Sequence, residues 1–280
     1  MLIGHRVIIK DLKRLADRGE LSHGYVFWGP AMVGKRVVAE ALANYLESGD
    51  FEEPKLIQDF LRISPDEKNT IGIDRVREIK NFLWQKPALS ARRTVVLDDA
   101  QCMTTDAQNA LLKITEEPPA SSLILLTTSD SDALNPTVFS RLQKIYFSPV
   151  SRDELAAWAT EKFGGAKNVL EAVRKSAGRP GLLHAFLTGE DFTESVEVAE
   201  RMFKLPADKR RDLVKKIMDR DDFNFGKLLD AIILVSSWEF MEKKNVSFWH
   251  KLLELRYQTD YFNLNPRLQI EALFQKYHLV

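Results

Sequence analysis

A loop with a glycine near each end carries the clearest chemistry in this sequence. Residues 29–35 read Gly-Pro-Ala-Met-Val-Gly-Lys, the G-x-x-x-x-G-K spacing of a phosphate-binding loop. Gly29 and Gly34 let backbone N–H groups turn inward around a phosphate, and Lys35 can reach the outer phosphates of a nucleotide. An apolar run at 25–28 precedes the loop, and apolar residues at helical spacing follow it. We therefore predict an anion-binding loop between a strand and a helix.

The residue after this loop departs from the pattern of an active nucleotide-hydrolysing site. That position normally holds Ser or Thr, whose hydroxyl oxygen ligates Mg²⁺, and here it is Arg36. A guanidinium group has no lone pair for a metal and stays charged at any working pH. We expect that phosphate can still bind here but that Mg²⁺ is weak or absent. A tight glycine turn without a ligand is the simpler interpretation.

A pair of carboxylates closes a second apolar run. Residues 94–97 read Thr-Val-Val-Leu and are followed by Asp98 and Asp99. This position matches a Walker B element, in which the first acid holds Mg²⁺ and the second activates water. The second acid is usually Glu, and Asp99 is one methylene shorter, which can misplace a water molecule. The pattern indicates Walker B geometry rather than catalysis, and a helix N-cap would use the same residue type.

The elements that position these groups follow from the apolar runs. Residues 25–28, 94–97 and 123–128 are apolar almost throughout and alternate with helical patterns, which predicts an α/β fold with a parallel sheet covered on both faces. We expect a helix capped by Asp74 and a loop over the polar residues 49–69. A further helix is expected from about residue 105.

The pattern of the chain changes after residue 149. Ser151 and Glu154 form a capping box, and the segments that follow are helical. We predict three parts: an α/β domain with the phosphate-binding loop, a small helical lid, and an all-α domain at the C-terminal end. The predicted bounds are 1–149, 150–189 and 190–280.

Composition restricts the classes of function. The 280 residues suit two or three domains, and 40 basic residues cancel 40 acidic ones. This balance argues against a protein that coats nucleic acid by charge alone. The single cysteine, Cys102, excludes an internal disulfide and a cysteine-based zinc site. No signal peptide or membrane span is visible, so we expect a cytoplasmic protein without membrane contact.

Several segments resemble the bacterial clamp-loader AAA+ family. Residues 109–119 read Asn-Ala-Leu-Leu-Lys-Ile-Thr-Glu-Glu-Pro-Pro, and residues 136–142 resemble the segment with the Ser-Arg-Cys motif, with Leu142 in place of Cys. Residues 123–129 resemble the sensor 1 strand and residues 265–274 the collar helix. These segments span nearly the whole chain. Within the family the chain is most similar to the delta-prime subunits of DNA polymerase III.

The resemblance implies roles for individual residues. Arg141 is expected to be an arginine finger that crosses a subunit boundary to the γ-phosphate of a neighbour's ATP, with Ser140 fixing its backbone. Thr128, at the end of the sensor 1 strand, joins the loop residues as a nucleotide-binding group. Gly181 occupies the position where motor subunits carry a sensor 2 arginine, although Arg179 lies two residues away.

The resemblance also implies partners and cofactors. It implies a hetero-pentameric ring in which this chain is a largely non-hydrolysing member, and which loads a sliding clamp on primer-template DNA. No cofactor is required, no zinc is expected, and ATP, ADP or phosphate can occupy the degenerate loop. Two alternatives stay open: an ATP-hydrolysing motor subunit (gamma/tau-like) of the same loader, and another AAA+ DNA-processing ATPase.

Basic residues gather around the helix expected after residue 74. They could contact DNA phosphates, but Asp74 and Glu78 dilute the positive charge, so a solvated helix face is an equal alternative. The cluster comprises Arg75, Arg77, Lys80, Lys86, Arg92 and Arg93.

Overall fold

The chain forms two compact units in the computed structural model. These units are Met1–Leu183 and His184–Val280. The sequence-based division at residues 149 and 189 stays a prediction. The structure describes residues 2–53, 55–164, 167–189, 191–219, 223–239, 246–259 and 264–276.

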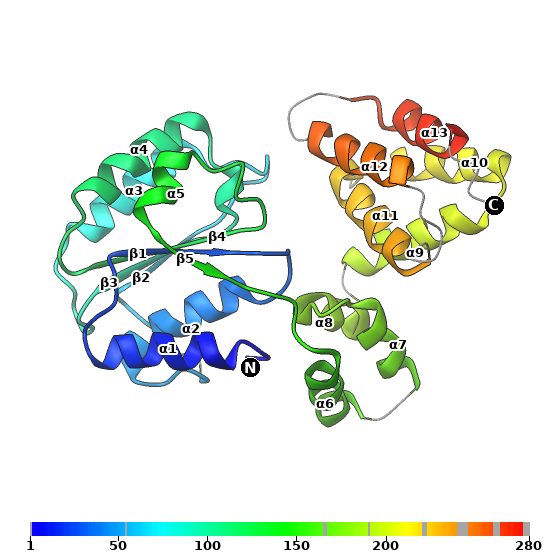
Figure 1. The fold of residues 1–280 in the computed structure, drawn as a ribbon. Coiled ribbons are helices and arrows are strands. Elements are labelled where there is room, and N and C mark those ends of the chain that lie inside the picture. The colour runs from blue at the N-terminus through cyan, green and yellow to red at the C-terminus, as the bar shows by residue number, and fades with distance from the viewer. Residues whose placement is uncertain are drawn as a thin grey trace. The chain divides into compact units, whose positions relative to one another are not determined.

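A parallel sheet forms the centre of the first unit (Figure 1). Its strand order is β2-β3-β4-β1-β5, and every neighbouring pair is parallel. The predicted α/β fold is therefore confirmed. The strands are β1 (Gly24–Trp28), β2 (Phe60–Ile63), β3 (Arg93–Leu97), β4 (Ser122–Thr128) and β5 (Gln143–Tyr146).

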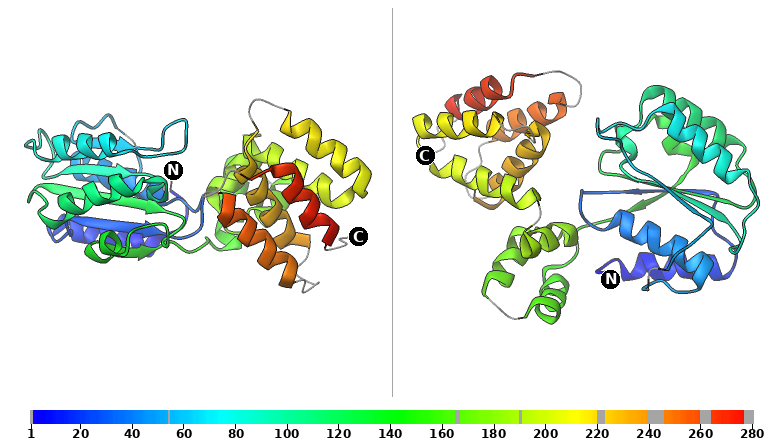
Figure 2. Two further views of the ribbon diagram at one scale, coloured as in Figure 1. Left: turned by 90° about the horizontal axis from the view of Figure 1, so that it is seen from above. Right: turned by 180° about the vertical axis from the view of Figure 1, so that it is seen from behind.

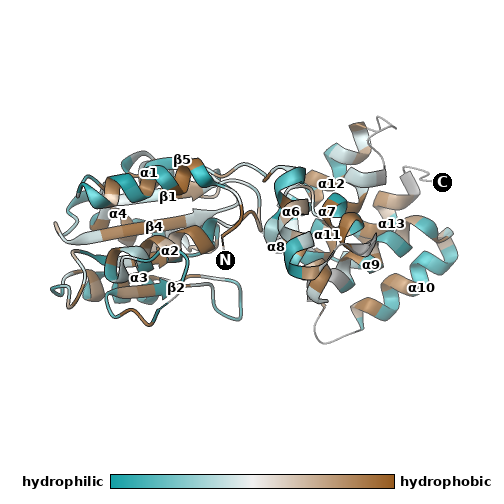
Figure 3. Cartoon of the chain, turned by 90° about the horizontal axis from the view of Figure 1, so that it is seen from below, coloured by the Kyte–Doolittle hydropathy of each residue, from teal (hydrophilic) through white to brown (hydrophobic). Residues whose placement is uncertain are grey.

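Helices cover both faces of this sheet, as Figures 1 and 2 show. In β4, Leu123 and Leu125 pack into the core cluster on the side of α1 and α2, while Ile124 and Leu126 pack into the cluster on the opposite side. Both faces of β4 are thus buried, which explains its continuous apolar run, visible as brown colour in Figure 3. The covering helices are α1 (Arg6–Asp17), α2 (Lys35–Ser48), α3 (Ile73–Leu83), α4 (Thr105–Glu116) and α5 (Pro136–Arg141).

Two edge strands correct the sequence-based description. The prediction of a loop over residues 49–69 is wrong for β2, in which only Ile63 is buried. β5, at the other edge, has no buried residue and was not anticipated by any pattern. An edge strand has only one neighbouring strand and partial cover, so no long apolar run marks it.

The predicted helix starts are correct in part. α3 begins at Ile73 with Gly72 as its N-cap, so Asp74 is not the cap; its carboxylate pairs with Arg77 at 2.7 Å. α4 begins at Thr105, as expected. In α6 (Arg152–Phe163), the hydroxyl of Ser151 accepts a hydrogen bond from the Glu154 N–H at 3.3 Å, which confirms the N-cap half of the predicted capping box. The carboxylate of Glu154 pairs instead with Nε of Arg6 at 3.2 Å.

The second unit is helical. Its core includes the rings of Phe203, Phe248 and Phe274, whose centroids lie 5.3–6.4 Å apart. α13 covers the segment expected as the collar helix. None of the helices in the described ranges combines the length and apolar character that a membrane crossing needs. The remaining helices are α7 (Lys167–Lys175), α8 (Pro180–Thr188, across the boundary of the units), α9 (Asp191–Lys204), α10 (Ala207–Met218), α11 (Phe225–Glu239), α12 (Val246–Thr259) and α13 (Pro266–Lys276).

Candidate nucleotide site and arginine finger

The phosphate-binding loop joins the end of β1 to the start of α2. Gly29 has φ 140°, and a Cβ atom there would lie 2.3 Å from the carbonyl oxygen of Phe147, so only glycine fits. Gly34, with φ 106°, is the N-cap of α2. The strand, loop and helix thus follow in the predicted order, and the positive end of the α2 dipole lies at the loop.

Lys35 is the first residue of α2 and is only 7% exposed. Its Nζ donates hydrogen bonds to the carbonyl oxygens of Gly29 (2.8 Å) and Pro30 (2.6 Å). Burial lowers the pKa of Lys35 to about 8, although the charges of Asp99 and Asp98 oppose this change. The ammonium group is therefore held inside its own loop, where a bound anion would raise its pKa again.

Arg36 lies beside the first acid of the Walker B element. Its Nη1 is 3.2 Å from Oδ2 of Asp98, and its Nε is 3.8 Å from Oε1 of Glu40. The other oxygen of Asp98 accepts a hydrogen bond of 2.6 Å from the hydroxyl of Thr127. Both oxygens of the Asp98 carboxylate, which would hold Mg²⁺ in an active site, thus already have polar partners. Arg36 offers no hydroxyl oxygen to a metal. This donor set does not fit Mg²⁺.

Asp99 follows at the end of β3 with a left-handed backbone (φ 49°). Its carboxylate accepts a hydrogen bond from Nε2 of Gln101 at 2.9 Å. The side chain retains contact with solvent, yet the protein atoms packed around it and the charge of Asp98 raise its pKa. The charges of Asp98, Asp99 and Lys35 therefore influence one another. The Walker B role of the two acids stays a prediction.

The two threonines at the end of β4 differ in their contacts. Thr128 donates from its hydroxyl to the carbonyl oxygen of Asp130 (2.7 Å) and accepts from the Asp130 N–H, so it stabilises a turn. Thr127 contacts both acids, because it donates to Asp98 and accepts from the N–H of Asp99 at 3.2 Å. Sequence reasoning selected Thr128 and missed Thr127. The pairing of β3 with β4 decides which threonine lies beside the acids.

Gly181 contacts the phosphate-binding loop directly. Its N–H donates to the carbonyl oxygen of Met32 at 2.9 Å. A Cβ atom at Gly181 would lie 3.1 Å from that oxygen, a tight contact that favours glycine. The start of α8 thus lies against the loop at the position where the resemblance places a sensor 2 arginine in motor subunits.

Arg141 is the last residue of α5 and its side chain is 36% exposed. Its Nη2 forms an ion pair with Oε1 of Glu116 at 2.8 Å, and its Nη1 donates to the carbonyl oxygen of Thr137 at 3.0 Å. Ser140 donates from its hydroxyl to the same carbonyl oxygen at 3.1 Å. The structure therefore places Arg141 in a group separate from the loop residues.

Gln108 links α4 to the segment that precedes α5, and sequence reasoning missed it. This side chain is 8% exposed and donates to the carbonyl oxygens of Met103 (3.4 Å) and Ala133 (3.0 Å). Its Oε1 accepts from the N–H of Asn135 at 2.6 Å. Asn135 is the N-cap of α5, so Gln108 helps to position the helix that carries Arg141. A buried amide inside an apolar helix face is the signal that could have revealed it.

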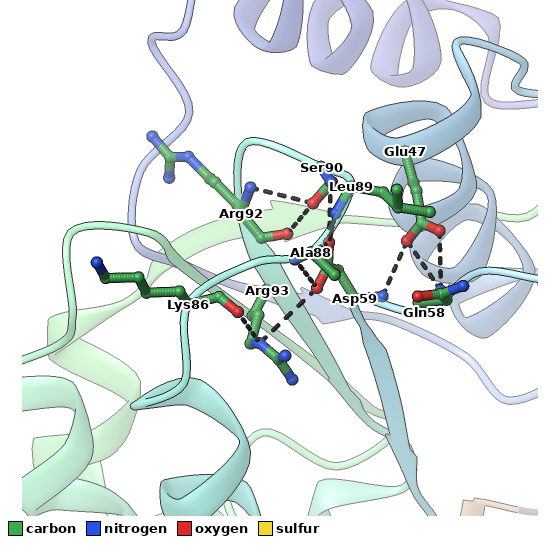
Figure 4. A network of polar contacts seen from close by, with 9 residues as sticks. All are labelled: Glu47, Gln58, Asp59, Lys86, Ala88, Leu89, Ser90, Arg92 and Arg93. Atoms are coloured by element: carbon green, nitrogen blue, oxygen red, sulfur yellow. Dashed lines mark hydrogen bonds and ion pairs between the residues drawn. The ribbon is translucent and has the colours of Figure 1, made fainter.

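Most side chains of the basic cluster around α3 form local contacts. Arg75 pairs with Glu78 at 2.7 Å, and Lys80 lies over the ring of Trp84. Arg93 lies 3.7 Å from the buried carboxylate of Asp59, in the network drawn in Figure 4. These contacts favour the interpretation of a solvated helix face over that of a DNA-binding surface.

Within the described ranges, no group of three or more His, Cys, Asp and Glu side chains could hold a metal ion.

Comparison with known proteins assigns the family. The family model described as "DNA polymerase III, delta subunit" matches residues 4–151, which is 148 of 280 residues. The chain belongs to this family. It is thus a member of the clamp-loader AAA+ proteins of DNA replication, as its resemblance in sequence implied.

Individual relatives agree with this assignment. The chain is 28% identical to the replication factor C small subunit of Haloarcula marismortui, over 97% of this chain and 89% of that protein. It is 34% identical to DNA polymerase III subunit delta' of Escherichia coli, over 48% of this chain and 41% of that protein. The match with this chain thus spans less than half the length of that delta' relative.

Similarity to a solved structure extends over nearly the whole chain. A DNA polymerase III gamma subunit-related protein from Thermotoga maritima superimposes with a TM-score of 0.64 and 25% identity. The match covers 96% of this chain and 97% of that protein. The fold of the clamp-loader subunits therefore extends over both units of the chain.

Proposed function

We propose that this chain is a delta-prime-like clamp-loader subunit that supplies Arg141 to a neighbour's ATP site and does not hydrolyse ATP itself. The observation that carries the proposal is the ion pair between Arg36 and Asp98 at 3.2 Å. In this proposal, the permanent cation of Arg36 takes the place that Mg²⁺ holds in an active site. Phosphoryl transfer depends on that metal to neutralise developing charge, so the loop can hold phosphate without cleaving a nucleotide.

The contact of α8 with the loop supports the same conclusion. Gly181 donates its N–H to Met32 and presents no side chain to the loop. An arginine at this position would bring a cation toward bound nucleotide in a motor subunit. Glycine cannot do so, and a larger residue would have to displace Met32.

The proposed role includes partners. In it, this chain is a fixed member of a hetero-pentameric ring of clamp-loader subunits in the cytoplasm. The ring opens a sliding clamp and places it on primer-template DNA. ATP, ADP or phosphate can occupy the degenerate loop, and turnover takes place on the neighbouring subunit.

The test is an Arg141→Ala variant in a loader reconstituted with its partner subunits. Removal of an arginine finger costs ~10³–10⁵ in rate at the site that it serves. We expect the clamp- and DNA-dependent ATPase to fall while gel filtration shows an intact complex. An ATPase equal to that of the wild type would refute the finger role.

The alternative is a gamma/tau-like motor subunit, which the likeness to the Thermotoga maritima gamma subunit-related structure favours. The ATPase of the isolated chain separates the two. Steady turnover that Lys35→Ala abolishes would support the motor, whereas no turnover above background is the result expected for the proposed subunit.

A further inference from the structure

We propose that Glu116 is a positioning residue for Arg141: its carboxylate orients the guanidinium group for a neighbour's ATP. The inference rests on the proposed function of Arg141. Glu116 is the last residue of α4, and its Oε1 lies 2.8 Å from Nη2 of Arg141. It comes from an element other than the α5 helix that carries the finger, so tertiary packing creates this contact.

The guanidinium group keeps free donors while it is held. An arginine side chain has five N–H donors. One of them is directed to Glu116 and another to the carbonyl oxygen of Thr137. The remaining donors are available for the oxygens of a phosphate group, and the side chain is 36% exposed. The two contacts therefore fix the plane of the group without closing it to a ligand.

The backbone beneath Arg141 is anchored. Val138, one turn earlier in α5, is fully buried, and Leu142, the next residue, is 4% exposed. The hydroxyl of Ser140 is bonded to the carbonyl oxygen of Thr137. The side-chain torsions of Arg141 are thus the main freedom left, and the ion pair with Glu116 restricts them.

Stability alone does not explain Glu116 at this position. A carboxylate in the last turn of a helix lies at the negative end of the helix dipole, which is unfavourable. Exposed ion pairs add little to stability. Glu117, the next residue, is also exposed to solvent, and its side chain has no polar partner within the described ranges. Of these two neighbouring glutamates, Glu116 is the one that contacts Arg141 and can orient it.

The test compares Glu116→Ala, Glu116→Gln, Glu117→Ala and Arg141→Ala in the reconstituted loader. Loss of an orienting contact frees one long side chain, so we expect Glu116→Ala to lower kcat by roughly three- to tenfold with KM for ATP unchanged. Glu116→Gln keeps a hydrogen-bond acceptor and should retain an intermediate kcat. Glu117→Ala should equal the wild type.

The double variant Glu116→Ala/Arg141→Ala shows whether Glu116 acts through the finger. We expect it to be no slower than Arg141→Ala, because the two residues form one unit. Additive losses in the double variant would overturn the inference. So would a Glu116→Ala kcat equal to that of Glu117→Ala while Arg141→Ala is impaired, and the finger itself would then stand. An unimpaired Arg141→Ala would instead refute the proposed function, and the role of Glu116 with it.

Discussion

At the phosphate-binding loop, the contacts of one arginine carry the proposal that the site binds phosphate without a metal. Arg36 pairs with Asp98 and lies near Glu40, which in turn pairs with Arg62 at 3.2 Å. In the proposed function, the site keeps the anion-binding parts of a nucleotide loop and has a fixed organic cation in place of a metal. The site differs from an active nucleotide site in the side chain of Arg36, whereas its loop keeps the backbone conformation of a phosphate-binding loop.

Replacement of Arg36 by Thr should release Asp98 and supply a hydroxyl oxygen. We expect Mg²⁺ to strengthen ATP binding to Arg36→Thr by roughly tenfold, or about 1.4 kcal/mol, and to leave the wild type unchanged. Calorimetry with and without Mg²⁺ measures this difference. Arg62→Thr removes the other cation bound to Glu40 and is the matched control. Equal binding with and without the ion in Arg36→Thr would mean that further losses disable the site.

The buried Lys35 predicts a dependence of stability on pH. Its folded pKa of about 8 lies below the ordinary value of 10.5, so between these values the unfolded chain binds a proton that the folded chain lacks. The free energy of unfolding should therefore rise with pH in this interval, relative to Lys35→Met, by about 2 kcal/mol. Urea denaturation of both proteins from pH 7 to 10 measures the difference. Parallel curves would show that the amine is not desolvated in solution.

At the scale of elements, Asp59 connects edge strand β2 to the loop that precedes β3. It is 2% exposed and its carboxylate accepts hydrogen bonds from the N–H groups of Ala88, Leu89 and Ser90 at 2.7–2.9 Å (Figure 4). Burial opposes ionisation, but these N–H groups and the charge of Arg93 outweigh it and lower the pKa. The position of β2 thus depends on a charged side chain as well as on apolar packing and on its pairing with β3.

An Asp59→Asn variant should be less stable by about 2–4 kcal/mol at pH 7, because it loses charge-assisted hydrogen bonds in a buried site. Since the folded pKa is lowered, this stabilisation is present above the unfolded pKa of ~3.9 and is lost as pH falls through the folded value. Thermal denaturation from pH 3 to 7 measures both effects. Asp66→Asn changes an exposed carboxylate with the same kind of backbone contacts and should cost less. Equal losses would show that the burial of Asp59 is unimportant.

At the scale of the whole molecule, the proposed ring predicts how the chain assembles. A clamp-loader subunit of this kind should enter a hetero-oligomer with motor subunits and should not form a closed ring by itself. Native mass spectrometry of the chain, alone and after mixing with its partners, measures the stoichiometry. We expect one copy in each complex. A homo-hexamer would favour the alternative of another AAA+ DNA-processing ATPase.

The sequence alone determined the features that depend on local chemistry. The apolar runs of β1, β3 and β4 indicated a parallel sheet, because strands buried on both faces need apolar side chains throughout. The glycine spacing and Lys35 indicated the loop, since its backbone conformation excludes most other residues. The replacement of a hydroxyl by Arg36 was visible without any structure.

The tertiary structure decided which distant groups meet. The edge strands β2 and β5 have no long apolar run, because each has only one neighbouring strand and incomplete cover. The contacts of Arg36 with Asp98 and of Arg141 with Glu116 join residues 62 and 25 positions apart. Such pairs depend on strand order and helix packing, which place side chains together at a cost in chain entropy that no local pattern records.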